Sequence, residues 1–197
     1  MAQPFVSRFA PAPSALDGST KAAEFYRAQF MTSLGPALVK GEIWTARRKS
    51  DNAVVGLAIW SLPGHTMSDT PEQKQYAETY ERLISADSPN QKAEADVKKK
   101  IKAERDLAYP DLWRNTSHLH ILVTLPSSRG TGTGGALLAE FVRHAREGGQ
   151  GMSLSTPTES NRRFYERKGF KTIWEREVFY PDGKREPYIV MAQDMEG

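Results

Sequence analysis

The chain of 197 residues contains no cysteine. This absence excludes disulfide bonds, a cysteine nucleophile and metal sites built on thiolates. Long apolar runs are also missing, because the longest, at residues 53–60, is far shorter than a membrane span and is interrupted by Gly56. The first 13 residues have no apolar core of signal-peptide length. We therefore expect a soluble cytoplasmic protein that has no membrane partner.

A large excess of charge of either sign is lacking as well. The 27 Lys and Arg residues and 24 Asp and Glu residues leave a net charge of +3, and both signs are mixed along the chain. A nucleic-acid partner is therefore not predicted, although a mildly positive pocket for an anionic ligand is compatible with this balance. Hydrophobic residues make up 39% of the chain, which is typical of a globular protein, and the length predicts one domain over residues 1–197.

Strands and helices alternate irregularly along the chain. In the first half of the chain, the sequence pattern predicts a short strand at 4–10, a helix at 14–34 capped by Ser14, a hairpin at 42–62, and two helices within 68–108 broken at 87–90. In the second half it predicts a strand at 118–126, a helix ending near 146, a strand at 151–156, a helix at 157–168 and a hairpin at 170–193. An antiparallel hairpin at each end indicates an α+β fold rather than a doubly wound sheet.

A glycine-rich loop joins the strand at 118–126 to the next helix. Gly130, Gly132, Gly134 and Gly135 follow Arg129 there, so the backbone can approach a ligand and the first N–H groups of the helix can bind a pyrophosphate. No lysine follows the glycines, which excludes a Walker-type loop. The spacing formally fits a dinucleotide fingerprint, but the next strand, MSLST, has no acidic residue at its end. A merely flexible turn is the simpler alternative.

Two motifs set about 30 residues apart favour a more specific interpretation. Residues 126–134 read P-x-x-R-x-x-G-x-G, and residues 161–170 read NRRFYERKGF. Together they resemble the acetyl-CoA loop and the second motif of the GCN5-related N-acetyltransferase (GNAT) superfamily. The resemblance implies a mixed, mostly antiparallel central sheet flanked by helices, with a helical insertion at about 65–115. It also implies acetyl-CoA as co-substrate and no metal.

The same resemblance implies which residues hold acetyl-CoA. The backbone of the glycine loop would bind the pyrophosphate, the strand before it would pair with the pantetheine arm, and an asparagine in the second motif would contact that arm or cap its own turn. The residues concerned are Leu122, Val123, Thr124, Arg129, Gly130, Thr131, Gly132, Thr133, Gly134, Gly135 and Asn161.

Two histidines precede the loop and alternate with apolar residues. His118 and His120 would share one face of the strand, and Leu119, Ile121, Val123 and Leu125 would line the other. Imidazole is the side chain best suited to take a proton near neutral pH, although each histidine could be merely a hydrogen-bonded strand residue. The H-L-H-x-L segment resembles that of aralkylamine (serotonin) N-acetyltransferases, where both histidines are associated with removing the amine's proton. This makes His120 the first candidate for the base and His118 the second.

Tyr165 completes the candidate site. In the family, the tyrosine of the second motif lies near the thioester sulfur and acts as a general acid, although a helical tyrosine can equally be a core residue. The resemblance implies an N-acetyltransferase for a primary amine, most simply a small molecule, that reacts by direct attack in a ternary complex. A protein or peptide acetyltransferase and a non-catalytic acyl-CoA-binding module are the alternatives, and the protein is expected to be a monomer or homodimer. Aromatic side chains that could line the acceptor pocket are Phe25, Phe30, Trp60, Tyr76, Tyr80, Tyr109 and Trp113.

Overall fold

The computed structural model describes residues 20–87 and 89–193. Six strands form one sheet in the order β1-β2-β3-β4-β6-β5, in which only β3 and β4 are parallel. The predicted mixed, mostly antiparallel α+β sheet is therefore confirmed. The strand expected at 4–10 and the expected cap Ser14 lie outside the described residues.

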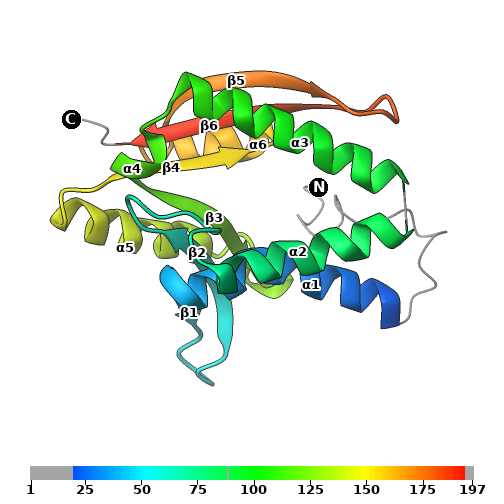
Figure 1. Ribbon diagram of the computed structural model, residues 1–197. Coiled ribbons are helices and arrows are strands. Elements are labelled where there is room, and N and C mark those ends of the chain that lie inside the picture. The colour runs from blue at the N-terminus through cyan, green and yellow to red at the C-terminus, as the bar shows by residue number, and fades with distance from the viewer. Residues whose placement is uncertain (1–19, 88, 194–197) are drawn as a thin grey trace.

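The elements agree closely with the sequence pattern. The helices are α1 (Thr20–Lys40), α2 (Pro71–Asp87), α3 (Pro89–Ala108), α4 (Leu112–Asn115), the 3-10 helix η2 (Pro126–Ser128), α5 (Thr133–Glu147) and α6 (Glu159–Glu166). The strands are β1 (Glu42–Arg47), β2 (Val54–Ser61), β3 (Thr116–Thr124), β4 (Gly151–Thr156), β5 (Lys171–Phe179) and β6 (Arg185–Gln193). Figure 1 shows α1 and α2 beside the β1–β2 end of the sheet, and α3 beside β5 and β6.

Helix α1 ends later than its sequence pattern predicts, at Lys40 rather than at residue 34, because it continues through Gly35 and Pro36. A side chain at Gly35 would collide with the ring of Tyr76, at 2.5 Å from a Cβ atom, so glycine permits α1 and α2 to pack closely. The buried Gln73 side chain joins the same two helices, since its Nε2 donates to the carbonyl of Pro36. Its Oε1 accepts from the backbone N–H of Thr70, whose Oγ1 accepts from the N–H of Gln73, which is a reciprocal capping box.

The main core lies between the sheet and α5. Trp60 of β2 stacks on Phe141 of α5 with ring centroids 3.6 Å apart, and both side chains are fully buried. Leu119 of β3 and Leu154 of β4 belong to the same cluster. Trp60 is therefore part of the core and not of an acceptor pocket, which corrects one of the sequence-based candidates.

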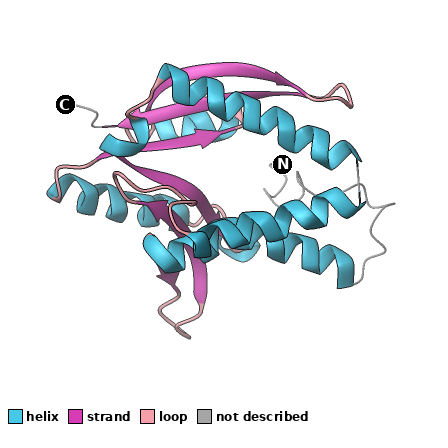
Figure 2. Ribbon diagram, in the orientation of Figure 1, coloured by secondary structure: helices cyan, strands magenta, loops and turns pink. Residues whose placement is uncertain are grey.

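The sheet opens between its two parallel strands. The pairing of β3 with β4 ends at Leu119 and Leu154, although β3 continues to Thr124, and Figure 2 shows the two strands diverging. A bulge at the same level leaves His120 without a partner on β2, because Ile121 pairs with Ile59 and Leu119 with Trp60.

The bulge also corrects the predicted division of faces on this strand. Leu122, rather than Ile121, packs with Leu119 against the α5 core. The extra residue shifts the alternation by one position, so Ile121 and Val123 lie on the same face as the histidines and not on the helix-packing face.

In the part of the chain that the structure describes, no helix is long and apolar enough to cross a membrane.

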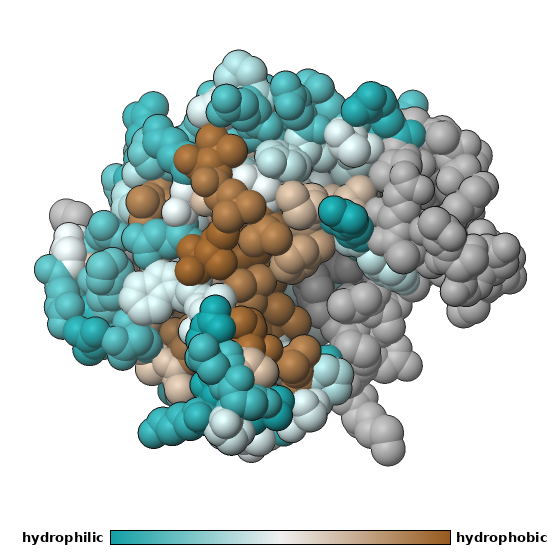
Figure 3. Space-filling view, turned by 90° about the horizontal axis from the view of Figure 1, so that it is seen from below, coloured by the Kyte–Doolittle hydropathy of each residue, from teal (hydrophilic) through white to brown (hydrophobic). Residues whose placement is uncertain are grey.

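Seen from below, the surface shows an apolar band between polar regions (Figure 3). Near the end of α1, the large apolar side chains of Leu38 and Val39 are exposed.

Candidate active site

The glycine loop has the geometry of an anion-binding turn. Gly130 and Gly132 adopt left-handed backbone angles, with φ of 75° and 83°, which other residues seldom adopt. Gly132 is the N-cap of α5, so the first N–H groups of that helix, from Thr133 onward, have no carbonyl partner within the helix. Thr131 Oγ1 donates to the carbonyl of Ser128 at 2.7 Å and lies 2.8 Å from Thr133 Oγ1, which fixes the loop. These features fit a pyrophosphate.

The loop adjoins the free edge of β3. A Cβ atom at Gly134 would lie 3.5 Å from Thr124 Cγ2, so the start of α5 packs directly against the end of β3. Beyond Leu119, β3 pairs only with β2 among the described strands, and its β4-side edge is open. The structure thus brings the predicted pyrophosphate loop and the predicted pantetheine strand, residues 122–124, together.

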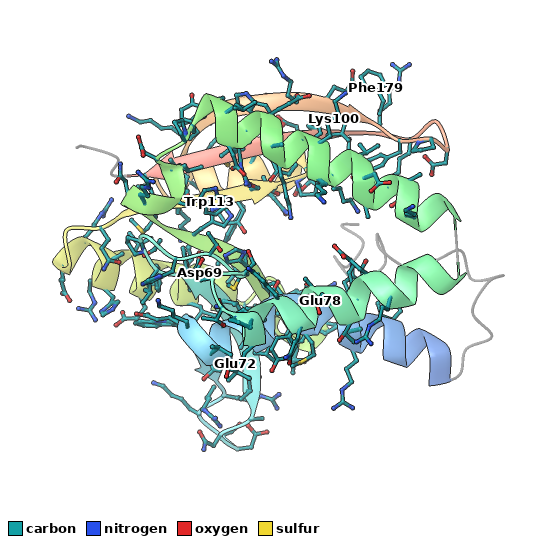
Figure 4. The ribbon with its side chains drawn as sticks, in the orientation of Figure 1. Asp69, Glu72, Glu78, Lys100, Trp113 and Phe179 are labelled. Atoms are coloured by element: carbon teal, nitrogen blue, oxygen red, sulfur yellow. The ribbon has the colours of Figure 1, made fainter. Side chains whose placement is uncertain are left out.

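Both histidines lie on the opposite face of the sheet from α5, and they contact each other. The ring centroids of His118 and His120 are 4.9 Å apart, and His118 is buried whereas His120 is partly exposed. Trp113 of α4 covers them, with its ring centroid 4.1 Å from that of His118 and 6.4 Å from that of His120. In Figure 4, Trp113 lies on the α3–α4 side of the sheet opening, whereas the labelled acidic residues Asp69, Glu72 and Glu78 lie on the α2 side.

A buried hydrogen-bond chain fixes the tautomer of His118. Thr116 Oγ1 donates its single proton to the carbonyl of Leu112 at 2.6 Å, so it accepts from Ser153 Oγ at 2.7 Å. Ser153 Oγ has then used its proton and accepts from His118 Nδ1 at 2.8 Å. His118 therefore carries its proton on Nδ1, which leaves a lone pair on Nε2.

Both histidines are neutral at physiological pH. Burial lowers the pKa of His120 to about 3, and the positive charges of Lys102 and Arg105 add to this effect. The pKa of His118 is held well below its usual range by burial and by the neighbouring His120, Arg105 and Lys102. His120 Nε2 lies 3.0 Å from Oγ of the buried Ser61, which orients its ring.

Arg105 connects this cluster to strand β6, which lies beyond β4 in the sheet. Its guanidinium lies 4.3 Å from the Trp113 ring centroid and donates from Nη1 to Tyr188 Oη of β6 at 3.0 Å. Its Nε and Nη2 contact the carboxylate of Asp106 at 2.8 and 2.7 Å. The side chain is only 6% exposed, so these contacts hold α3 and α4 in place over the histidines.

Tyr165 lies on the other face of the sheet. Its ring packs against the α5-side core and makes edge contacts with Phe164 and Phe170, with centroids 5.1 and 5.9 Å away. Burial raises the pKa of its phenol, which therefore stays protonated. The tyrosine and the histidines are thus on opposite faces, and the open edge between β3 and β4 lies between those faces.

Asn161 is exposed in the first turn of α6 and is not the cap of that helix. Thr158 occupies the cap position, and its side chain accepts from the backbone N–H of Asn161 at 3.1 Å. Of the two alternatives for Asn161, capping of its own turn is therefore excluded for the N-terminus of α6.

Several polar residues of the site have no sequence motif. Ser61, Lys102, Arg105, Thr116, Ser153 and Tyr188 are brought to the histidines by sheet pairing and helix packing. Two hydroxyls of β4 beyond the opening, Ser155 Oγ and Thr156 Oγ1, are buried without a hydrogen-bond partner in the described part of the chain. Of the aromatic candidates, Trp113 contacts the histidines, whereas Tyr109 donates to the carbonyl of Ile173.

The arrangement of an open edge between parallel strands, a glycine loop and a following helix has a counterpart in a known family. A model of the acetyltransferase (GNAT) domain matches residues 67–185, which is more than half of the chain. The chain belongs to this family. It is an N-acetyltransferase with acetyl-CoA as its co-substrate, as the loop predicts.

Solved structures agree with this fold. The acetyltransferase described as histone acetyltransferase HPA2 and related acetyltransferase from Corynebacterium glutamicum is 20% identical, with a TM-score of 0.55 over 95% of this chain and 85% of its own. A GNAT-family acetyltransferase from Desulfovibrio desulfuricans is 18% identical, with a TM-score of 0.50 over 93% and 87%. A search of curated proteins found no match to the chain. At these identities the structural likeness establishes the fold of the acetyltransferase and not its acceptor.

Proposed function

We propose that the acetyltransferase transfers the acetyl group of acetyl-CoA to a primary amine of a small molecule, by direct attack in a ternary complex. The observation that carries this proposal is the pair of neutral, contacting histidines on one face of the sheet opening. The glycine loop adjoins that opening, and Tyr165 lies on its other face. Donor and acceptor could therefore meet through the opening from opposite sides.

The residues of the donor side are those named by the resemblance. The N–H groups of residues 130–135 and the α5 dipole bind the pyrophosphate, with Arg129 at the start of the loop. The main chain of residues 122–124 pairs with the pantetheine arm, and Asn161 contacts that arm. A backbone N–H of β3 polarises the thioester carbonyl.

Proton transfer accompanies the attack. The amine nitrogen bonds to the thioester carbon, the C–S bond breaks, and the phenol of Tyr165 protonates the departing thiolate. The phenolate of Tyr165 then regains a proton from water. The amine's proton passes to the histidine pair, with His120 as the partly exposed member and His118 as the second. Because the pKa of His120 is only about 3, the proton does not stay on the imidazole and continues to water.

The two-histidine segment also supports a likeness to aralkylamine N-acetyltransferases. This likeness is limited to that segment. In this proposal the helices at 65–115 are an insertion in a single domain. Trp113 of α4 contacts His118 and Arg105 of α3 lies over Trp113, so part of this insertion covers the histidines and disfavours an open groove for a peptide. The retained histidines and Tyr165 disfavour a non-catalytic acyl-CoA-binding module. We place the enzyme in the cytoplasm, as a monomer or homodimer.

Thiol release from acetyl-CoA, measured against panels of small amines and of peptides, tests the proposal. Amine-dependent release with small molecules and little with peptides is the expected result. Preference for peptides would favour the protein-directed alternative. Thermal stabilisation by acetyl-CoA without release on any acceptor would favour the binding module.

A further inference from the structure

The charged groups that act on the histidine pair are cations from one helix. Arg105 of α3 lies over Trp113, which contacts His118. Lys102 stands three residues earlier, so both side chains project from the same side of the helix. The charges of Lys102 and Arg105 act on both histidines, which makes this side of the opening electropositive.

The two cations differ in how far they are neutralised. Arg105 is buried and is held by Asp106 and Tyr188. Lys102 is exposed, and no described carboxylate lies within ion-pair distance, 4.0 Å, of its ammonium group. Burial and the charge of Arg105 lower the pKa of the Lys102 ammonium group. Asp106 opposes this effect from farther away, but the contacts of Arg105 already engage its carboxylate. Lys102 is therefore a cation without an ion-pair partner among the described carboxylates, beside the buried His118 and the partly exposed His120. A carboxylate brought by a ligand would favour its charged form.

An acceptor that carries only an ammonium group is a poor match for this environment, because two like charges repel it as it approaches the histidines. A carboxylate close to the amine removes this conflict, since a flexible lysine ammonium binds a carboxylate as a point charge. We propose that the acceptor is an amine with a carboxylate near it, as in an amino acid, and that Lys102 binds this carboxylate while the amine faces His120. This inference rests on the proposed function and names the class of its acceptor.

Matched pairs of acceptors isolate the carboxylate. Tryptophan and tryptamine, phenylalanine and phenethylamine, lysine and cadaverine, and glutamate and 4-aminobutyrate each differ by one carboxylate at the carbon that bears the amine. The specificity constant kcat/KM of each is measured by thiol release at fixed acetyl-CoA. For the pair whose side chain fits, we expect the wild-type enzyme to prefer the carboxylated member by about tenfold or more, the ratio typical of a hydrogen bond to a charged group.

Lys102→Gln tests the assigned residue, and Lys100→Gln is its control, because Lys100 is an exposed lysine of the same helix (Figure 4). The preference for the carboxylated member should fall about tenfold in Lys102→Gln and keep its wild-type value in Lys100→Gln. An equal loss on both members of a pair, or an equal change in both variants, would overturn the assignment of Lys102.

Binding of the same pairs to the CoA-saturated protein, measured by calorimetry, separates this inference from the proposed function. If no amine is acetylated but the carboxylated members bind and Lys102→Gln abolishes that binding, the function fails and the carboxylate site stands. If decarboxylated members are acetylated and bound better, the site fails and the function stands. If no member of any pair binds or reacts, the inference is overturned.

Discussion

Replacement of Ser153 by alanine breaks the hydrogen-bond chain that sets the tautomer of His118. Ser153 Oγ is fully buried and links His118 Nδ1 to Thr116 Oγ1 at 2.8 and 2.7 Å. In Ser153→Ala the Nδ1–H of His118 loses its acceptor, while Thr116 keeps its bond to the carbonyl of Leu112. A buried donor left without a partner costs about 1–3 kcal/mol, so we expect the free energy of unfolding to fall by about that amount.

The tautomer supplies a second readout that lost stability alone does not produce. With no acceptor for Nδ1–H, His118 can place its proton on Nε2, and the lone pair that faces away from Ser153 is lost. The chain has four histidines, so nitrogen NMR of labelled protein can resolve the His118 ring. We expect the Nδ1–H form in the wild-type protein and a mixed population in Ser153→Ala.

A neighbouring serine provides the control. Ser155 lies two positions further along β4 on the same face, and its buried Oγ has no hydrogen-bond partner in the described residues. Ser155→Ala should not lower the unfolding free energy, because no hydrogen bond is lost, and should leave the His118 spectrum at its wild-type value. If urea denaturation shows equal stability for both variants, or if His118 carries its proton on Nε2 in the wild-type protein, the assigned chain is wrong.

Three further predictions concern other parts of the site. The His120 pKa of about 3 lies below the unfolded value of 6.5, so its contribution to the free energy of unfolding is fully present above pH 6.5. This contribution is lost as the pH falls toward 3, by about 4 kcal/mol at most. Urea titrations should show a smaller loss of unfolding free energy for His120→Gln, and parallel curves for the two proteins would contradict the shift. Tyr165→Phe should lower kcat by about 100-fold or more and leave CoA affinity nearly unchanged, because only the phenol proton is removed; an unaltered kcat in single-turnover assays would exclude the acid role. Gly132→Ala places a Cβ atom at φ 83°, which costs about 1–2 kcal/mol, so calorimetry should show CoA binding weakened by about tenfold, and wild-type affinity would argue against the loop assignment.

Local patterns predicted most of the fold. Turn-forming pairs marked both hairpins, and the structure places a turn at Asp51 and Asn52, with Asn52 at φ 58°, and another around Gly183. The break between α2 and α3 and the helix after the glycine loop also follow the sequence pattern. These features are local because each depends on the conformational preference of one or two residues or on a single helical period.

The surroundings of the histidines could not be predicted in the same way. Arg105 reaches Tyr188 across 83 positions of sequence, and Ser61 reaches His120 across 59. Such pairs arise from sheet order and helix docking, which leave no periodic signal. The four-residue helix α4 that carries Trp113 is also too short to show one. The bulge at His120 is a change of one residue in pairing, so strict alternation assigns Ile121 and Val123 to the wrong face.

The burial of the histidines changes what the pair can contribute to the proposed reaction. A histidine with an ordinary pKa of 6.5 would give the rate an acid limb at that pH, because protonation would remove the base. With a pKa of about 3, His120 stays neutral over the whole range in which the enzyme can be assayed. The ionisation of the acceptor's own ammonium group then sets the pH profile, and the rate rises until that group is deprotonated. Acceptors with different amine pKa values should therefore shift the limb of the profile with them, whereas a limb fixed near pH 6.5 for all acceptors would show that the histidine retains its ordinary basicity.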